Sequence, residues 1–138
     1  RCLDLSLDYA ATRKQFGQPI GRFQMIQSML AEMYSLIEAA RLSAYRALAA
    51  CDAMQKGEGG RGSIHMICAA SVLQGAEMIA KVTDMAVQIH GGSGFVWETE
   101  VNRHYRNARI ASLGGGTTEV RKLIIAEELF RAKGLSLG

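Results

Sequence analysis

Residues 25–37, MIQSMLAEMYSLI, lie at the centre of the longest stretch of helical periodicity in the chain. Apolar side chains recur there at intervals of three and four residues, with Met25, Met29 and Met33 on one stripe. This spacing is typical of an amphipathic α-helix, and methionine is well suited to filling irregular gaps in a core. The pattern extends from about residue 22 to residue 55, which corresponds to about 50 Å of helix at 1.5 Å per residue. A helix of this length in a small domain predicts a helical bundle.

Three further long segments have helical character, at about 1–14, 64–89 and 119–133, and a shorter one covers about 101–112. Stretches rich in glycine separate them, and the only proline of the chain lies in the first of these stretches. Because short connections favour antiparallel neighbours, the four long segments predict an all-α fold, an up-down four-helix bundle.

Composition sets the broad class of the protein. The chain has 138 residues, of which 49% are hydrophobic and 21% are charged, as in ordinary globular domains. A formal charge of +3 is too small to indicate nucleic acid as the main partner. No uninterrupted apolar run has the length of a membrane span, so no transmembrane segment is expected. The three cysteines are far apart in sequence and odd in number, which predicts neither a disulfide framework nor a metal site but a reducing compartment.

The beginning of the chain indicates a larger protein. Residue 1 is arginine, and helical spacing is already present at Leu3, Leu7 and Ala10. We therefore expect the chain to start inside a helix, as a piece of a longer protein.

Two glycine-rich stretches are candidate ligand loops. The stretch 88–95, QIHGGSGF, follows a helical pattern and has three glycines within four positions. It is consistent either with a helix end and a turn or with a backbone cradle for a phosphate-bearing ligand. The stretch 113–119, LGGGTTE, precedes the last helix, where Thr117 or Thr118 is a plausible N-cap and the helix N-terminus favours an anion. Between the two loops lie Arg103, His104, Arg106 and Arg109. They form a solvated basic face, or pair with nearby acids, or act as a clamp on phosphate or on another subunit's carboxylates.

Catalytic motifs are not evident in the residues themselves. The chain has no HExxH, GxSxG or P-loop pattern, and its three histidines are far apart. The residues alone therefore indicate a helical bundle with two glycine-lined loops that could hold a phosphorylated ligand.

Five motifs in register resemble the C-terminal helical domain of acyl-CoA dehydrogenases. They are residues 13–20 (RKQFGQPI), 23–33 (FQMIQSMLAEM) with Ala40 and Arg41, 88–95 (QIHGGSGF), 103–110 (RHYRNARI) and 116–121 (GTTEVR). The resemblance covers almost the whole chain. It implies that residues 1–138 are the C-terminal bundle of a longer flavoprotein, whose N-terminal helical and middle β domains lie outside this chain.

The resemblance also implies an activity. Members of the family use FAD to oxidise an acyl-CoA to the trans-2-enoyl-CoA, and they pass electrons to an electron-transfer flavoprotein. Their C-terminal bundles build dimers and tetramers, with FAD lying across a dimer interface. The expected location is the cytoplasm, or the mitochondrial matrix if the source is a eukaryote.

The resemblance further assigns roles to individual residues. Arg13 would pair with the FAD pyrophosphate, and Phe16 would pack near the adenine end. Residues 88–92 would meet the FAD of a neighbouring subunit through backbone groups, and Gly116 would contact substrate. The full set of expected cofactor-binding residues is Arg13, Gln15, Phe16, Gln24, Gln88, Ile89, His90, Gly91, Gly92, Thr117 and Glu119, and no metal is expected.

The sequence departs from the family pattern at three positions. Many members have a glutamate as the catalytic base where this chain has Gly115, and glycine cannot take a proton. Branched-chain and long-chain members also lack that glutamate and take the base from earlier in the helix that ends near Arg13, which would place it before Arg1. We therefore expect no catalytic residue in this chain and no activity from the fragment alone. Glu100 replaces a usual proline and Asn107 a usual aspartate, which affects local contacts only.

Two other functions remain open from the sequence. The same architecture serves flavin monooxygenases and acyl-CoA oxidases, and the missing glutamate is compatible with both. A non-catalytic subunit that only assembles is the other alternative.

Overall fold

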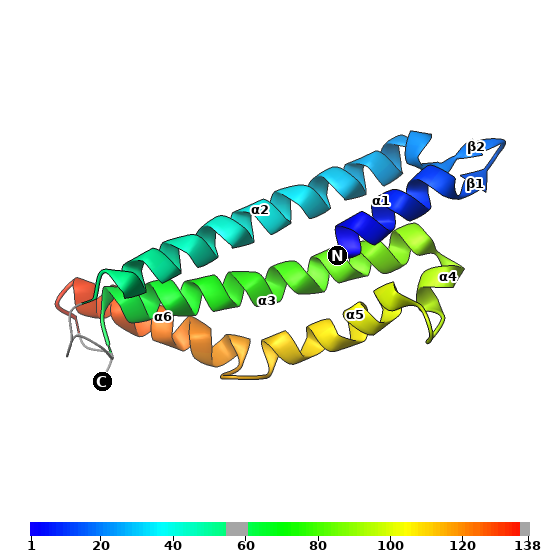
Figure 1. Cartoon of the computed structure of the whole chain (residues 1–138). Coiled ribbons are helices and arrows are strands. Elements are labelled where there is room, and N and C mark those ends of the chain that lie inside the picture. The colour runs from blue at the N-terminus through cyan, green and yellow to red at the C-terminus, as the bar shows by residue number, and fades with distance from the viewer. Residues whose placement is uncertain (55–60, 136–138) are drawn as a thin grey trace. The chain divides into compact units, whose positions relative to one another are not determined.

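The computed structural model describes residues 1–54 and 61–135 and confirms an all-α fold, in which the only strands among these residues form one small hairpin. The chain divides into two compact units. Unit 1 comprises Arg1–Glu38 and Met78–Ile110, and unit 2 comprises Ala39–Glu77 and Ala111–Gly138. In order, the elements are α1 (Cys2–Thr12), β1 (Lys14–Gln15), β2 (Gln18–Pro19), the 3-10 turn η1 (Ile20–Arg22), α2 (Gln24–Asp52), α3 (Ser63–His90), α4 (Gly92–Phe95), α5 (Glu100–Ala108), the 3-10 turn η2 (Arg109–Ser112) and α6 (Thr118–Ala132) (Figure 1).

The predicted helix boundaries agree with the structure to within a few residues, and three connecting segments contain more regular structure than predicted. The first connection is not only a turn, because it contains the β1–β2 hairpin and η1. The short segment at 101–112 is two elements, α5 and η2, and the glycine loop before it contains the short helix α4. Most of the predicted flexible connection at 56–63 lies outside the described residues.

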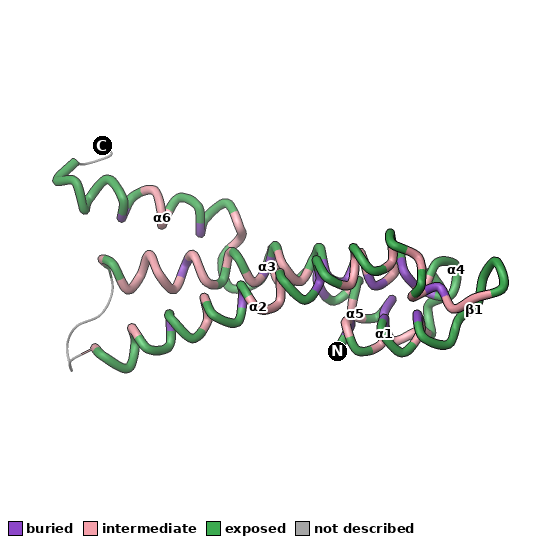
Figure 2. Tube along the Cα trace, turned by 90° about the horizontal axis from the view of Figure 1, so that it is seen from above, coloured by how far each residue is buried: buried purple, intermediate pink, exposed green. Residues whose placement is uncertain are grey.

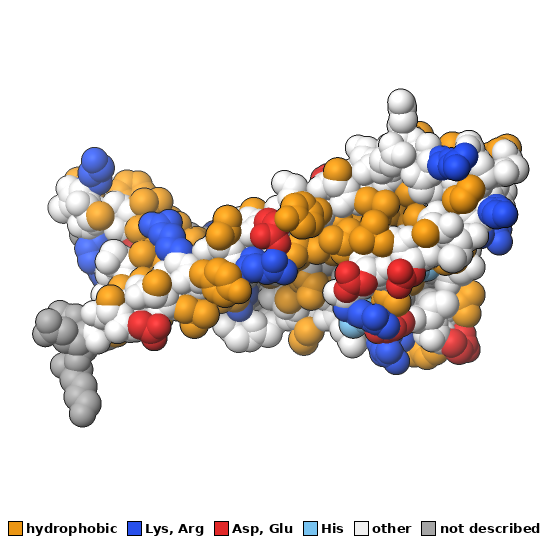
Figure 3. Space-filling model, turned by 45° about the horizontal axis from the view of Figure 1, so that its top comes forward, with side chains coloured by type: hydrophobic (Ala, Val, Ile, Leu, Met, Phe, Trp, Pro, Cys, Tyr) orange, Lys and Arg blue, Asp and Glu red, His pale blue; other side chains and the backbone are white. Residues whose placement is uncertain are grey.

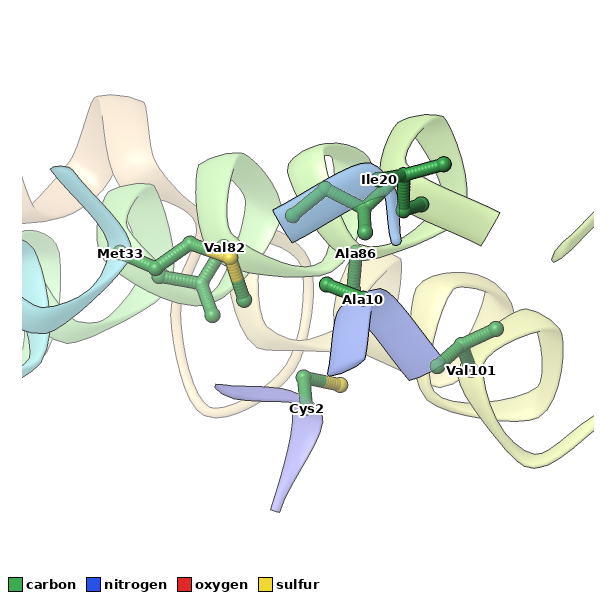
Figure 4. Close-up of a cluster of buried hydrophobic side chains, with 8 residues drawn as sticks. Cys2, Ala10, Ile20, Met33, Val82, Ala86 and Val101 are labelled. Carbon is green, nitrogen blue, oxygen red and sulfur yellow. The ribbon is translucent and has the colours of Figure 1, made fainter. Parts of the chain in front are cut away.

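Four helices supply the core of unit 1. Its buried apolar side chains come from α1, α2, α3 and α5, together with Ile20 of η1 (Figure 4). Met33 has no exposed surface, as expected for a methionine that fills a core, whereas Met25 at the start of α2 is exposed. The fourth helix of this unit is α5 and not the last helix of the chain, which belongs to unit 2. The core residues are Cys2, Ala10, Ile20, Met33, Val82, Ala86, Ile89 and Val101.

An ion pair connects α1 to α5 within unit 1. The Arg1 guanidinium donates to both carboxylate oxygens of Glu100, over 2.9 and 3.0 Å. The hydrogen bond and the positive charge of Arg1, with a smaller contribution from His104, lower the pKa of Glu100 to about 2. Glu100, where the resemblance leads one to expect a proline, therefore links the start of α5 to α1.

Unit 2 is built from the second half of α2, the first half of α3 and α6. Its buried apolar residues are alanines, including Ala47, Ala69 and Ala76, and small side chains allow helix backbones to approach closely. The tubes of these helices show few buried positions, and α6 is mostly exposed (Figure 2). The buried Glu128 carboxylate connects α6 to α3, because it lies 3.4 Å from Nδ1 of His65, and it also accepts from Arg131 of the same helix at 3.1 Å.

Helix α3 is long and apolar enough to cross a membrane when length and composition alone are considered, which the sequence analysis did not expect. Core helices of soluble proteins meet the same criterion. The rest of the chain buries 11% of the apolar window of α3.

Candidate functional site

A cavity of about 450 Å³ opens on unit 1, between the hairpin and the end of α3. This volume lies within the range of small-molecule sites, roughly 300–1,000 Å³. The walls come from the end of α1, the hairpin, the start of α2 and the 89–93 loop, which are distant in sequence. The lining residues are Tyr9, Arg13, Gln15, Phe16, Ile20, Phe23, Ile26, Ile89, His90, Gly91, Gly92 and Ser93.

The hairpin forms one wall of the cavity. Strands β1 and β2 pair antiparallel with Gln15 opposite Gln18, so that Phe16 and Gly17 form the two-residue turn. Both have positive φ, 51° and 79°, as a two-residue turn of type I′ requires. That conformation is unfavourable for a bulky residue such as phenylalanine, and strained residues of this kind cluster at ligand sites. The Phe16 side chain is 92% exposed and meets Phe23 edge to face, with ring centroids 6.1 Å apart.

Arg13 brings a positive charge to the cavity. Its backbone is fixed on both sides, because its amide donates to the Tyr9 carbonyl and its carbonyl accepts from the Ile20 amide, each over 2.8 Å. Its guanidinium has no hydrogen-bond or ion-pair partner among residues 1–54 and 61–135. Among the residues that the structure describes, none of those lining the cavity is acidic. The site is therefore electropositive and suited to an anionic group.

The end of α3 and the glycine loop form the opposite wall. Gly91 ends the helix with a φ of 57°, and its amide donates to the Gln88 carbonyl at 3.1 Å. The His90 ring is held by an Nδ1 contact of 2.7 Å to the Ala86 carbonyl and by stacking on Tyr9 at 4.3 Å. The hydroxyl of Tyr9 also lies 3.5 Å from that of Ser93. The wall therefore combines exposed backbone with a fixed pair of rings.

Close packing holds the loop in this position. A Cβ atom on buried Gly94 would lie 2.6 Å from the Val87 carbonyl oxygen, so only glycine fits there. The buried amide of Asn102 on α5 donates to the carbonyls of Gly94 and Phe95, both at 3.1 Å. Of the three glycines in this loop, only Gly91 has a positive φ.

The structure brings together most of the residues expected to bind the cofactor in unit 1. Gln24 and Gln88 are exposed and do not line the cavity. The apolar lining residues Ile20, Phe23 and Ile26 were not predicted, and neither was the stacking of Tyr9 on His90. Tyr9 could have been found, because it lies about one helical turn before Arg13, the residue that ends α1. The expected residues that line the cavity are Arg13, Gln15, Phe16, Ile89, His90, Gly91 and Gly92.

The second glycine loop lies in unit 2 and has its own support. Gly115 and Gly116 have positive φ, 64° and 95°. The buried guanidinium of Arg121 donates to the carbonyls of Gly114 at 3.0 Å and Gly115 at 3.2 Å. Although Gly115 has no side chain to hold the loop, the hydrogen bonds from Arg121 fix the loop backbone.

The start of α6 is capped as expected. The Thr117 hydroxyl accepts from the Val120 amide at 3.3 Å, which confirms Thr117 as the N-cap. Hydrogen bonds from the backbone amide of Glu119 itself, and then from the hydroxyls of Thr117 and Thr118, lower the pKa of the Glu119 carboxyl. Because this carboxylate already supplies a negative charge, the helix end is less suited to a phosphate than the sequence suggested.

The basic stretch on α5 and η2 has partners within the chain. Arg106 lies over the Trp97 ring at 3.5 Å and donates to Asn102. His104 lies 3.5 Å from Glu100, and Arg109 also has a partner. These contacts favour the interpretation that the basic residues bind neighbouring groups of this chain, and they argue against a phosphate clamp.

Comparison with known proteins identifies the family. The family model for the C-terminal domain of acyl-CoA dehydrogenase matches residues 1–130. The mitochondrial isovaleryl-CoA dehydrogenase of Solanum tuberosum is 38% identical over 131 residues, which cover 94% of this chain and 30% of that protein. This chain therefore spans about a third of the length of the curated relatives that it matches.

Solved structures give the same result. A putative acyl-CoA dehydrogenase of Mycobacterium smegmatis superposes with a TM-score of 0.85 at 34% identity, covering 94% of this chain and 32% of that one. An acyl-CoA dehydrogenase of Bacillus anthracis in complex with FAD gives a TM-score of 0.84 at 32% identity, covering 97% and 26%. The chain described here belongs to the acyl-CoA dehydrogenase family, and its residues 1–130 correspond to the C-terminal domain of that family.

Proposed function

We propose that this chain is the FAD-binding C-terminal domain of an acyl-CoA dehydrogenase that oxidises an acyl-CoA to the trans-2-enoyl-CoA. The observation that carries the proposal is the cavity of unit 1, where Arg13, the strained Phe16 and the Gly91–Gly92 backbone meet. These residues belong to motifs that resemble those of acyl-CoA dehydrogenases, and in the folded chain they line one cavity.

The lining of the cavity suits part of a flavin dinucleotide. A diphosphate needs a charged donor, and the guanidinium of Arg13 can bind two phosphate oxygens at once. A planar ring needs apolar surface, which Phe16, Phe23 and Ile20 supply. We assign Arg13 to the pyrophosphate and Phe16 to the adenine end, with the 91–92 backbone beside them.

The chemistry of the reaction divides between this chain and the rest of the protein. FAD, when bound, supplies the acceptor for the hydride that leaves the β carbon of the substrate. A carboxylate must take the α proton, and Gly115 has no side chain for this. We therefore place the base on a part of the protein before Arg1. Gly116 is proposed to contact substrate, and Thr117 and Glu119 to contact the cofactor, where the Glu119 carboxylate would accept from hydroxyl groups and not from phosphate.

The exposed apolar surface supports self-association as a dimer or tetramer. Apolar side chains are spread over the face shown in Figure 3, and large exposed ones lie on α2 and α6, among them Leu42, Leu48 and Leu123. Single exposed leucines are ordinary on a protein surface, but several large apolar side chains exposed on neighbouring helical turns are typical of a surface that another copy covers. We further propose an electron-transfer flavoprotein as the redox partner, and the cytoplasm or the mitochondrial matrix as the location.

The proposed reaction can be tested on the intact parent protein. Its flavin absorbance would be recorded without oxygen while a panel of straight and branched acyl-CoAs is added. We expect one of them to bleach the flavin band, because removal of two electrons from the substrate reduces the flavin. The isovaleryl-CoA dehydrogenase relative makes short branched acyl-CoAs the first to try.

The alternatives make different predictions in the same experiment. A bound flavin that no acyl-CoA bleaches would contradict the dehydrogenase reaction and leave a monooxygenase or a non-catalytic subunit. Rapid reoxidation of the bleached flavin by air would instead indicate an oxidase.

A further inference from the structure

Two of the three cysteines meet in unit 2 although they are 17 residues apart in sequence. Cys51 lies in the last turn of α2 and Cys68 in the second turn of α3, and their sulfur atoms are 3.6 Å apart. Both are free thiols. The third cysteine, Cys2, is buried in the core of unit 1. All three cysteines are far apart in sequence, and folding brings Cys51 and Cys68 into contact.

The two thiols differ in accessibility. Cys51 is exposed, whereas Cys68 is half-buried. Burial raises the pKa of the Cys68 thiol, and its contact with Cys51 raises it further. Because the thiolate is the nucleophile in disulfide exchange, the exposed Cys51 is the residue that an oxidant reaches first.

We propose that Cys51 and Cys68 form a redox modification site that a small-molecule disulfide converts to a disulfide bond between α2 and α3. The Cys51 thiolate attacks one sulfur of oxidised glutathione, forms a mixed disulfide and releases one glutathione thiolate. The Cys68 thiolate then attacks the Cys51 sulfur and releases the second glutathione. The two cysteines are oxidised, one glutathione disulfide is reduced to two thiols, and two protons pass from the cysteines to the products.

The geometry allows this bond with a small movement. The sulfur atoms must approach from 3.6 Å to about 2.0 Å. Cys51 is next to Asp52, the last residue of α2, and helix ends adjust more easily than helix centres. In a reducing compartment the pair stays reduced, so the bond forms only when the pool of disulfides rises. The site depends on unit 2 alone and is independent of the proposed flavin chemistry.

Peptide mapping of the full-length parent protein tests the proposal. The protein would be incubated with oxidised glutathione, its remaining thiols alkylated, and the sample cleaved with trypsin. Cleavage after Arg46, Lys56, Arg61 and Lys81 places Cys51 in peptide 47–56 and Cys68 in peptide 62–81. We expect these two peptides to be joined, with a mass two hydrogens below their sum, while the Cys2 peptide is alkylated.

Two variants establish the order of attack. In Cys68→Ser, glutathione should remain on Cys51, because the second thiol that releases it is absent. In Cys51→Ser, modification of Cys68 should be several-fold slower than that of Cys51 in the first variant. Wild-type protein in which peptides 47–56 and 62–81 stay separate, or are joined only between two different chains, would overturn the proposal.

Discussion

Gly94 shows how one residue holds the candidate site in place. Because Gly94 has no side chain, the loop can pack closely against the end of α3. A Cβ atom at this position would lie 2.6 Å from the Val87 carbonyl oxygen and 2.9 Å from the Cβ of His90. We predict that Gly94→Ala lowers the free energy of unfolding by about 1–3 kcal/mol, because the backbone must move to admit a methyl group. Urea unfolding of the flavin-free parent protein would measure this.

The neighbouring glycine provides the matched control. A Cβ atom on Gly92 would meet no atom within 4 Å, and its φ is not positive. Gly92→Ala should therefore leave the free energy of unfolding within about 0.5 kcal/mol of the wild-type value. Equal effects of the two substitutions would show that packing at position 94 does not fix the loop.

The same loop shows what the sequence could predict at the residue scale. The run of glycines correctly marked the end of α3 at Gly91. Glycine is required at position 91 because the backbone has a positive φ there, and at position 94 because no Cβ atom fits. The sequence shows glycine at both positions and so could not distinguish these two reasons. The partner of the loop, Asn102, follows Gly94 by eight positions on another helix, and nothing in the local pattern marks it.

At the scale of elements, the cap of α6 was predictable and the hairpin was not. Threonine and glutamate before a helical pattern are a known start signal, and Thr117 is the N-cap. The strands β1 and β2 have only two residues each, too few for any alternation. Their turn places Phe16 at positive φ, which sequence propensity argues against for a bulky residue.

The cap gives a prediction for α6. Thr117→Ala should lower the free energy of unfolding by about 1 kcal/mol, because the Val120 amide loses its acceptor. Thr117→Ser keeps a hydroxyl and should stay close to wild type. Unfolding followed by circular dichroism would compare the two, and an alanine variant as stable as the serine variant would rule out the cap as a source of stability.

At the scale of the whole molecule, the sequence predicted the number of long helices but not how they divide. Counting long segments identified α1, α2, α3 and α6. The core of unit 1 instead uses the nine-residue α5, whose apolar contribution to that core is Val101. The cavity joins residues 9–26 to residues 89–93. The five family motifs predicted most of its lining, because a family pattern carries spatial information that periodicity lacks.

The central claim is that this cavity holds the phosphates of FAD through Arg13, and the flavin content of variants tests it most directly. The intact parent protein would be purified as wild type, as Arg13→Ala and as Arg22→Ala. Arg22 is an exposed arginine nearby that does not line the cavity. Loss of one charged contact of about 1.5–3 kcal/mol predicts FAD binding weaker by about 10- to 150-fold in Arg13→Ala only. Equal flavin-to-protein ratios and equal FAD affinities in all three proteins would contradict the account.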